Sequence, residues 1–304
     1  MTNLADATTI PSLTLNNHRL IPQEGLGVFQ MTDFNTCKQA VLSALHSGYR
    51  LIDTAQVYQN EAAVGAALQV AAVPRDELFI TTKVWLTAYG QQQTIESVKK
   101  SLTRLHLDYL DLVLLHEPYG DYYGAYRGLE QLVTAGLVRT IGVSNFDAGQ
   151  LLDLSHQMTI QPAVNQVELN LYQQQAPLRR YQQSAGIALE AWAPFGEAPA
   201  ELFAEPTVQQ LSRQHGKTPA QILLRYLTQL GAIVIPKTVH ATRMRENQAL
   251  WDFTLTPTDL HQLAALDRGQ WLSPDRHSLA ATQHYMDLID ADSDSNSESS
   301  NSRV

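Results

Sequence analysis

Short apolar runs alternate with longer amphipathic segments along most of the chain. Eight of these runs have about the length of an ordinary β-strand, roughly 5–6 residues. They are Gly25–Val28, Arg50–Asp53, Leu78–Lys83, Asp111–His116, Arg139–Val143, Ala163–Val167, Ile187–Trp192 and Ala232–Pro236. The segments between them space their apolar residues as one face of a helix does, for example in Phe34–Ser47 and Gln92–Leu105. Thr218–Leu230 opens with Thr-Pro, which indicates a helix cap followed by proline in the first turn.

Eight strands that each precede a helix predict an α/β fold, the (β/α)8 TIM barrel. An open, doubly wound sheet is the alternative. Its dinucleotide fingerprint G-x-G-x-x-G is missing, because Gly25-Leu26-Gly27 is followed by Gln30 where the third glycine would stand. Ahead of the barrel, Ser12–Leu15 and Arg19–Ile21 flank an Asn-Asn pair, which predicts an N-terminal β-hairpin.

The end of the chain differs in composition from the rest. Residues 287–304 read DLIDADSDSNSESSNSRV, with five acidic residues and one arginine, so they carry −4 of the net charge of −9. A segment with few apolar residues and a high charge cannot offset the entropy that it loses on ordering. We therefore predict one barrel domain, residues 1–286, followed by a disordered Ser/Asp-rich tail, residues 287–304. A solvated terminus is the simplest interpretation, and a phosphorylated or partner-binding tail is the alternative.

Charge and composition narrow the class of protein. A net charge of −9 argues against a nucleic-acid partner, which needs clustered lysine and arginine. No run of about 18 apolar residues occurs, so we expect no membrane span. Met1–Ile10 lacks the basic and apolar regions of a secretory signal, and the single cysteine, Cys37, cannot form an internal disulfide or a cysteine-based zinc site. We expect a soluble, cytoplasmic protein without a metal, since no H-E-x-x-H motif is present.

Ionisable side chains stand at the ends of three consecutive predicted strands. Asp53 ends RLID, Lys83 ends LFITTK and His116 ends DLVLLH, and Tyr58 follows in the loop after Asp53. The active sites of (β/α)8 barrels lie at the carboxyl ends of the strands. A carboxylate, an ammonium, an imidazole and a phenol are therefore expected to meet at one mouth of the barrel.

This set of groups can deliver a proton to a carbonyl oxygen. Tyrosine titrates near pH 10, so Tyr58 needs a nearby cation that favours its phenolate, and Lys83 supplies that charge. A buried lysine needs a counter-charge, which Asp53 provides, and His116 can hydrogen-bond the same oxygen and orient it. Taken one by one, the four residues have plainer interpretations: a cap, a surface lysine, a structural histidine and a packing tyrosine.

Several strings resemble the signatures of the aldo-keto reductase family, in the right order and at matching spacings. They are RLIDTAQVYQNE, LFITTKVW, DLVLLHEP, IGVSNF, NQVELN and IPKT with the arginine and Glu-Asn that follow it. Within the family, the chain resembles the prokaryotic 2,5-diketo-D-gluconate reductase and glyoxal reductase group. The resemblance implies a catalytic tetrad, with Tyr58 as its general acid, formed by Asp53, Tyr58, Lys83 and His116.

The same resemblance implies an NADP(H) cofactor and places it on the chain. Ser144, Asn145 and Gln166 match the positions that hold the nicotinamide carboxamide, and Trp192 matches the ring that stacks on the nicotinamide. The residues that match the adenosine and 2′-phosphate site are Lys237, Thr238, Arg243, Glu246 and Asn247. Two cations and a hydroxyl suit a 2′-phosphate, which favours NADP(H) over NAD(H). The plainer alternatives are a core tryptophan at Trp192 and a solvated helix face at Arg243 and Arg245.

The chain departs from the prokaryotic pattern where the substrate pocket is expected. His116 is followed by Glu117 and a proline, where Trp-Pro is common among relatives. We expect Trp85, Glu117 and Tyr119 to line this pocket, with Tyr122 as a weaker candidate. Glu117 either disfavours anionic substrates or points to solvent.

The leading hypothesis is a monomeric enzyme that reduces an aldehyde or ketone with NADPH. Hydride leaves C4 of the nicotinamide and Tyr58 protonates the oxygen, with α-dicarbonyls or keto-sugar acids as candidate substrates. An NADP(H)-binding regulatory or redox-sensing protein of the same fold is the alternative, although the complete tetrad favours turnover. A Schiff-base lyase that uses Lys83 as nucleophile is a third class, disfavoured because the adjacent Asp53 keeps the lysine charged.

Overall fold

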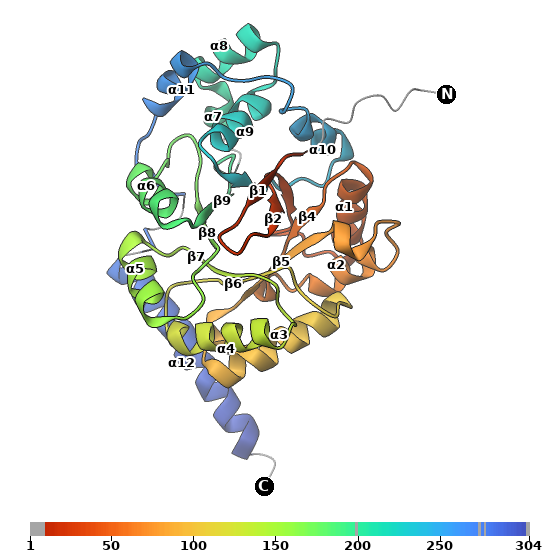
Figure 1. The fold of residues 1–304 in the computed structure, drawn as a ribbon, viewed down its shortest axis with the longest axis vertical. Coiled ribbons are helices and arrows are strands. Elements are labelled where there is room, and N and C mark those ends of the chain that lie inside the picture. Colours follow the sequence, from red (N-terminus) through yellow and green to blue (C-terminus); the bar gives the residue numbers. More distant parts are fainter. Residues whose placement is uncertain (1–9, 198–199, 273–274, 277, 302–304) are drawn as a thin grey trace.

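A computed structural model of the 304-residue chain describes residues 10–197, 200–272, 275–276 and 278–301, the last nine of these by their backbone alone. Figure 1 shows a ring of strands surrounded by helices. Eight parallel strands are hydrogen-bonded in the order β10-β9-β8-β7-β6-β5-β4-β3, and a parallel bridge between Glu24 and Val234 joins the two ends. The predicted (β/α)8 barrel is therefore confirmed.

Each barrel strand coincides with one of the predicted runs. The strands are β3 (Gly25–Gly27), β4 (Leu51–Asp53), β5 (Phe79–Val84), β6 (Leu112–Leu115), β7 (Ile141–Ser144), β8 (Val164–Glu168), β9 (Ala188–Trp192) and β10 (Ile233–Val234). Every residue in them is buried except Ala188 and Trp192, at the two ends of β9. Strands that are covered on both faces are apolar throughout, which explains why the runs are continuous rather than alternating.

Helices follow the strands and form the outer layer. They are α1 (Phe34–His46), α2 (Glu61–Leu68), α3 (Gln91–Leu105), α4 (Tyr122–Thr134), α5 (Ala148–Gln157), α6 (Ala176–Ala185), α7 (Ala200–Ala204), α8 (Pro206–His215), α9 (Pro219–Gln229), α10 (Ala241–Gln248), α11 (Pro257–Ala264) and α12 (Leu279–Asn301), with short 3₁₀ turns η1 (Gln56–Tyr58), η2 (Arg75–Glu77) and η3 (Leu86–Ala88). The three helices predicted by residue range correspond to α1, α3 and α9. Thr218 caps α9 in a capping box with Gln221, as its Thr-Pro opening indicates.

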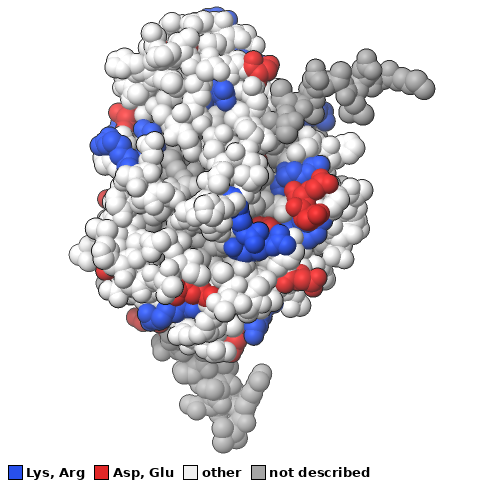
Figure 2. All heavy atoms as spheres, viewed as in Figure 1, with Lys and Arg blue, Asp and Glu red and all other residues white. Residues whose placement is uncertain are grey.

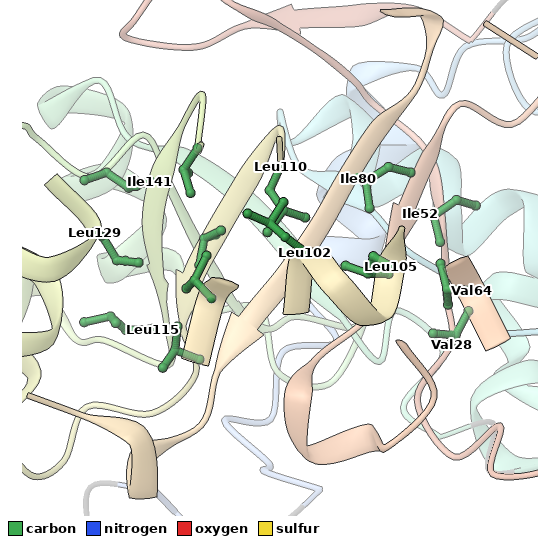
Figure 3. Close-up of a cluster of buried hydrophobic side chains, with 14 of the residues drawn as sticks. Val28, Ile52, Val64, Ile80, Leu102, Leu105, Leu110, Leu115, Leu129 and Ile141 are labelled. Carbon is green, nitrogen blue, oxygen red and sulfur yellow. The ribbon is translucent and has the colours of Figure 1, made fainter. Parts of the chain in front are cut away.

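A buried apolar cluster between the strands and the helices holds the outer layer in place. Figure 3 shows part of this cluster, including Ile52 of β4, Ile80 of β5, Val64 of α2 and Leu105 of α3, all fully buried. Removing one such side chain from water stabilises the fold by roughly 1.5–3 kcal/mol. The helical spacing of apolar residues in the sequence thus marks the faces that the helices turn to the strands.

The predicted hairpin is present and covers one end of the barrel. Strands β1 (Ser12–Thr14) and β2 (Leu20–Pro22) pair antiparallel. Ile21 belongs to the buried cluster that fills the barrel interior together with Leu51 and Leu112. In Figure 1 the hairpin lies over the centre of the ring. The carboxyl ends of the strands, where the candidate residues stand, therefore open on the opposite side.

The C-terminal segment is more structured than its composition indicates. Helix α12 crosses the predicted domain boundary at 286, and both Tyr285 and Ile289 pack against the main core cluster. Ala281, Tyr285 and Ile289 recur every four residues, so they share one face of the helix. Disorder of the tail from 287 to 304 stays a prediction. Residues 302–304 lie outside the described part of the chain, as do residues 1–9, for which the sequence predicts no secretory signal.

The surface carries charges of both signs. On the face drawn in Figure 2, lysine and arginine are interspersed with aspartate and glutamate. Such a mixture is typical of a solvated surface rather than of the single-sign field that binds a polyanion. Among the helices of the described residues, none has the length and hydropathy needed to cross a bilayer.

One buried carboxylate inside the barrel stands out. Glu190, in the middle of β9, is fully buried, and neither of its carboxylate oxygens has a hydrogen-bond partner of good geometry among the described residues. Burial and, after it, the charge of Asp53 raise the pKa of Glu190 to about 8, although the charge of Lys83 lowers it in part. The carboxyl group of Glu190 therefore holds its proton more tightly in the folded protein than in the unfolded chain, where the pKa of glutamate is about 4.3.

Replacing Glu190 with glutamine should change how stability depends on pH. The stability from the bound proton is fully present below about pH 4.3 and is lost as pH rises through about 8. Because glutamine cannot ionise, the free energy of unfolding of Glu190→Gln minus that of the wild type should grow by on the order of 3 kcal/mol between pH 5 and 9. Urea unfolding at pH 5, 7 and 9 measures this difference, with Glu96→Gln on exposed helix surface as the control. A difference that is the same at pH 5 and 9 would show that Glu190 is ionised throughout.

Candidate active site

The carboxyl ends of the strands surround a cavity of about 670 Å³. Asp53 ends β4, Lys83 lies one residue before the end of β5, and His116 directly follows β6. Tyr58 ends η1, in the loop after β4. Asp53, Tyr58 and His116 line the cavity, while Lys83 is fully buried and contacts the first two. The structure therefore brings together the four residues that the sequence singles out.

The loop that carries Tyr58 is fixed by a buried amide. Asn60 donates from Nδ2 to the carbonyl oxygen of Val28 (2.8 Å), and its Oδ1 accepts from the hydroxyl of Thr54 (2.7 Å). These bonds tie the loop after β4 to the loop after β3. Tyr58 is consequently held in one place relative to Lys83, which a proton donor needs if it is to meet its target at a fixed distance.

Lys83 and Asp53 form an ion pair that is closed off from water. The lysine Nζ lies 2.5 Å from Asp53 Oδ1, 3.1 Å from the carbonyl oxygen of Thr54 and 3.4 Å from the hydroxyl of Tyr58. The side chains are 0% and 2% exposed. Gln166 donates to the second carboxylate oxygen at 3.0 Å. Because removing two charges from water costs about as much as their attraction returns, such a pair adds little stability, and its presence points to chemistry.

Burial dominates the proton affinities of the site. It raises the pKa of Tyr58, and the charge of Lys83 lowers it only in part, so the phenol is protonated at neutral pH. The sequence predicts a lowered pKa for Tyr58. The structure places the expected cation beside the phenol, but burial raises the pKa by more than the cation lowers it. Burial lowers the pKa of Lys83, but the charges of Asp53 and Tyr58 raise it above its usual value, so the lysine stays charged.

His116 is uncharged and faces Tyr58. Burial, followed by the charges of Lys83 and Arg276, holds the pKa of His116 well below its usual value. The imidazole and phenol rings are nearly perpendicular, with centroids 5.6 Å apart. A neutral imidazole keeps one N–H group that can donate to an oxygen. Tyr58 and His116 thus present two donors to the same part of the cavity.

The residues predicted to hold a nicotinamide lie together on the cavity wall. Ser144 and Gln166 stand on β7 and β8, Asn145 follows β7, and Trp192 ends β9. Asn145 has φ +64°, a left-handed conformation that asparagine adopts more readily than most residues, and its Oδ1 accepts from the Trp192 indole at 2.9 Å. Trp192 is half-buried and lines the cavity, so it is not enclosed in the core as the plainer alternative required.

The residues predicted for the adenosine end follow β10. Lys237 is exposed and lines the cavity, whereas Thr238 is buried. The others are on α10, where Arg243 is exposed and Asn247 is buried beside the half-buried Glu246. Arg245 lines a separate groove next to α1, since residues two apart on a helix point in different directions. The basic cluster seen in the sequence is therefore divided, and the roles of its members stay predictions.

Two of the predicted pocket residues line the cavity. They are Trp85 and Glu117. Glu117 is 2% exposed, so the alternative in which it points to solvent is wrong. Its Oε1 forms an ion pair with Arg276, and its Oε2 accepts from the Asn145 amide at 3.1 Å. A carboxylate with these partners is held inside the wall rather than released to water.

The other two pocket candidates lie elsewhere. Tyr119 is not among the described residues that line the cavity; it stacks on Tyr285, with ring centroids 4.7 Å apart, and so forms the layer behind the wall. Tyr122 packs edge-on against Phe146, at 5.3 Å between centroids. Their proximity in sequence to Glu117 does not place them at the mouth, because the chain turns outward toward α4 after β6.

Sequence reasoning missed the part of the wall that comes from the C-terminal segment. Arg276 and Tyr285 both line the cavity. Neither belongs to a signature string, and both lie just before the acidic segment 287–304. The spacing of Ala281, Tyr285 and Ile289 is the signal that could have indicated a packed helix here.

Comparisons with known proteins agree with this geometry. The model of the aldo/keto reductase family matches residues 25–268. A methylglyoxal reductase from Yersinia pestis is 44% identical over 272 residues (88% of this chain and 97% of that protein), and a glyoxal reductase from Bacillus subtilis is 40% identical over 269 residues (88% and 97%). The crystal structure of a Bombyx mori aldo-keto reductase in complex with NADP matches with a TM-score of 0.85 at 35% identity, covering 89% of this chain and 97% of that one. Since these matches extend over nearly the whole barrel, the chain belongs to the aldo-keto reductase family.

Proposed function

We propose that the protein reduces aldehydes and ketones to alcohols with NADPH. The observation that carries this proposal is the pair of donors, Tyr58 and neutral His116, that face one part of the cavity, with the ammonium of Lys83 3.4 Å from the phenol oxygen. Relatives named methylglyoxal reductase and glyoxal reductase support α-dicarbonyls as candidate substrates, beside keto-sugar acids.

The lining of the cavity fits a nicotinamide dinucleotide. Ser144, Asn145 and Gln166 offer donors and acceptors for a carboxamide, Trp192 offers a flat face for a ring, and Lys237 offers a cation at the same cavity. The NADP bound to the Bombyx mori relative supports the same cofactor here. When bound, NADPH supplies the hydride that the carbonyl carbon receives.

The residues of the chain act on the carbonyl oxygen. His116 donates a hydrogen bond that orients the oxygen, and Tyr58 gives it a proton as negative charge develops there. The phenolate that remains lies beside the ammonium of Lys83, which stabilises it. Asp53, 2.5 Å from this ammonium, keeps the lysine charged and in place. Both donors are neutral before the reaction, so the proton is available at neutral pH.

The same geometry argues against a Schiff-base lyase. A lysine must be uncharged to attack a carbonyl carbon. Lys83 has its pKa raised above the usual value, because the charges of Asp53 and Tyr58 outweigh burial, and its Nζ is engaged by three oxygens. Lys83 therefore acts as a fixed cation.

We further propose that the enzyme works in the cytoplasm as a monomer, without a nucleic-acid or membrane partner. The net charge of −9 supports the lack of a polyanion partner, and a single buried cysteine, Cys37, suits a reducing compartment.

Replacing Tyr58 with phenylalanine should remove the proton donor without changing the fold. We expect kcat/KM for methylglyoxal with NADPH to fall by about 10²–10⁴-fold while the Kd of NADPH is unchanged. NADPH oxidation at 340 nm and a fluorescence titration measure the two quantities. Tyr181→Phe, on the outer helix α6, is the matched control and should behave as the wild type. If Tyr58→Phe keeps its activity, Tyr58 is not the acid.

Replacing Arg243 with alanine should weaken the binding of NADPH but not of NADH. Loss of a charge-assisted bond to the 2′-phosphate raises the Kd of NADPH by about 10–100-fold, since such bonds contribute roughly 1.5–3 kcal/mol. Arg245→Ala removes a cation two residues away that lines a different groove, so it is the control. An equal loss for both cofactors, or none for either, would contradict a 2′-phosphate contact.

A further inference from the structure

A second buried carboxyl group lies outside the catalytic tetrad. Glu24 directly precedes β3 and is 0% exposed. Within the described part of the chain, two side chains bond to it, those of Tyr49 and Trp251, and no cation forms an ion pair with it. Arg225 lies behind the indole, with its guanidinium carbon 5.4 Å from the centroid of the Trp251 ring. The charge of Glu24 is therefore balanced by two hydrogen bonds alone.

The hydrogen bonds of Glu24 lead to helix α10 through Tyr49. The Tyr49 hydroxyl lies 2.7 Å from Glu24 Oε1 and 3.2 Å from the carbonyl oxygen of Met244, which is in α10. Burial, and after it the charge of Glu24, raises the pKa of Tyr49 well above its usual value, so the phenol keeps its proton. A phenol has one proton to donate, and here two acceptors are within reach of it. Only one of them can receive it at a time.

The protonation state of Glu24 decides which acceptor receives the Tyr49 proton. An ionised carboxylate can only accept, so Tyr49 donates to it and turns lone pairs toward the Met244 carbonyl. A protonated carboxyl has one O–H group, and Trp251 fixes where it lies. The indole Nε1–H, 3.3 Å from Oε2, can only donate and takes the bare oxygen, so the O–H group faces Tyr49. The phenol then accepts from Glu24 and donates to Met244.

Helix α10 carries the residues predicted to hold the 2′-phosphate of the cofactor. Gln221 ties its C-terminal end, donating to two carbonyl oxygens there at 2.9 Å each, whereas the residue that precedes its first turn makes no side-chain cap bond. The contact between Tyr49 and Met244 falls in the middle of the helix, next to Arg243. A helix that is already fixed loses less entropy when a ligand binds to it.

We propose that Glu24 and Tyr49 form a proton-controlled latch on α10: protonation of Glu24 turns the Tyr49 hydroxyl to the Met244 carbonyl and strengthens the binding of NADPH. The proton comes from solvent and returns to it when Glu24 ionises. Burial raises the pKa of Glu24 to about 7, although the bonds from Tyr49 and Trp251 lower it in part. The latch is therefore closed below neutral pH and open above it. This inference rests on the NADPH-dependent function proposed above.

The test compares the pH dependence of NADPH binding in the wild type and in Glu24→Gln. In this variant Trp251 takes the amide oxygen, so the NH₂ group faces Tyr49 and the latch stays closed at every pH. Fluorescence titration gives the Kd of NADPH at pH 6, 7 and 8. The 2′-phosphate titrates alike in both proteins, so the ratio of their Kd values isolates Glu24. We expect the wild-type Kd divided by that of Glu24→Gln to be close to one at pH 6 and about two- to fivefold at pH 8.

Two further variants separate the latch from other effects of pH. Tyr49→Phe cannot close the latch, so its Kd should exceed that of the wild type by about two- to fivefold at pH 6 and match it at pH 8. Glu96→Gln, on exposed helix surface, should follow the wild type at every pH. Urea unfolding shows whether each variant is folded, and if Tyr49→Phe is not, the ratio for Glu24→Gln decides alone.

The proposal is overturned if the ratio for Glu24→Gln is the same at pH 6 and 8, which would make Glu24 a structural residue. It is also overturned if Glu24→Gln binds NADPH more weakly than the wild type at pH 8. If neither protein binds NADPH at any pH, the cofactor proposed above is wrong, and this inference falls with it.

Discussion

A lysine and an aspartate in contact, with no water between them, constrain the whole mouth of this barrel. Lys83 and Asp53 sit on adjacent strands and bury their charges 2.5 Å apart. An apolar pair of similar size would stabilise the fold as well or better. The cation is placed where the phenolate of Tyr58 would form, and its charge adds to the burial that lowers the pKa of His116 and keeps it neutral. The buried pair therefore serves the proton donor Tyr58 rather than the stability of the fold.

Much of the fold and the four central residues could be predicted because both follow from local rules. Apolar runs such as Leu112–Leu115 are continuous since the strands are covered on both faces, and helical segments such as α3 reveal their buried stripe. In a (β/α)8 barrel, a polar residue at the carboxyl end of a strand faces the mouth. Asp53, Lys83 and His116 satisfy that rule without any knowledge of contacts.

Features that depend on distant packing could not be predicted. The burial of Glu117 requires Arg276, which lies 159 positions later in the chain. The direction of the Tyr58 pKa depends on how much burial outweighs one cation, and no sequence pattern gives that balance. The sequence predicts Tyr119 as a pocket residue, yet its ring stacks on Tyr285 of α12, and of these two it is Tyr285 that lines the cavity. The outcomes for Glu117 and Tyr119 are decided by the C-terminal segment, whose acidic composition hides its packed face.

The most direct test measures the single-turnover rate of NADPH oxidation in a protein that carries Asp53→Asn together with Lys83→Met. If the ion pair exists for proton transfer, this variant should unfold at a free energy close to that of the wild type, bind NADPH normally and reduce methylglyoxal about 10²–10⁴-fold more slowly. A rate within a few-fold of the wild type would contradict the account. It would mean that the buried charges serve the fold and that Tyr58 delivers its proton without them.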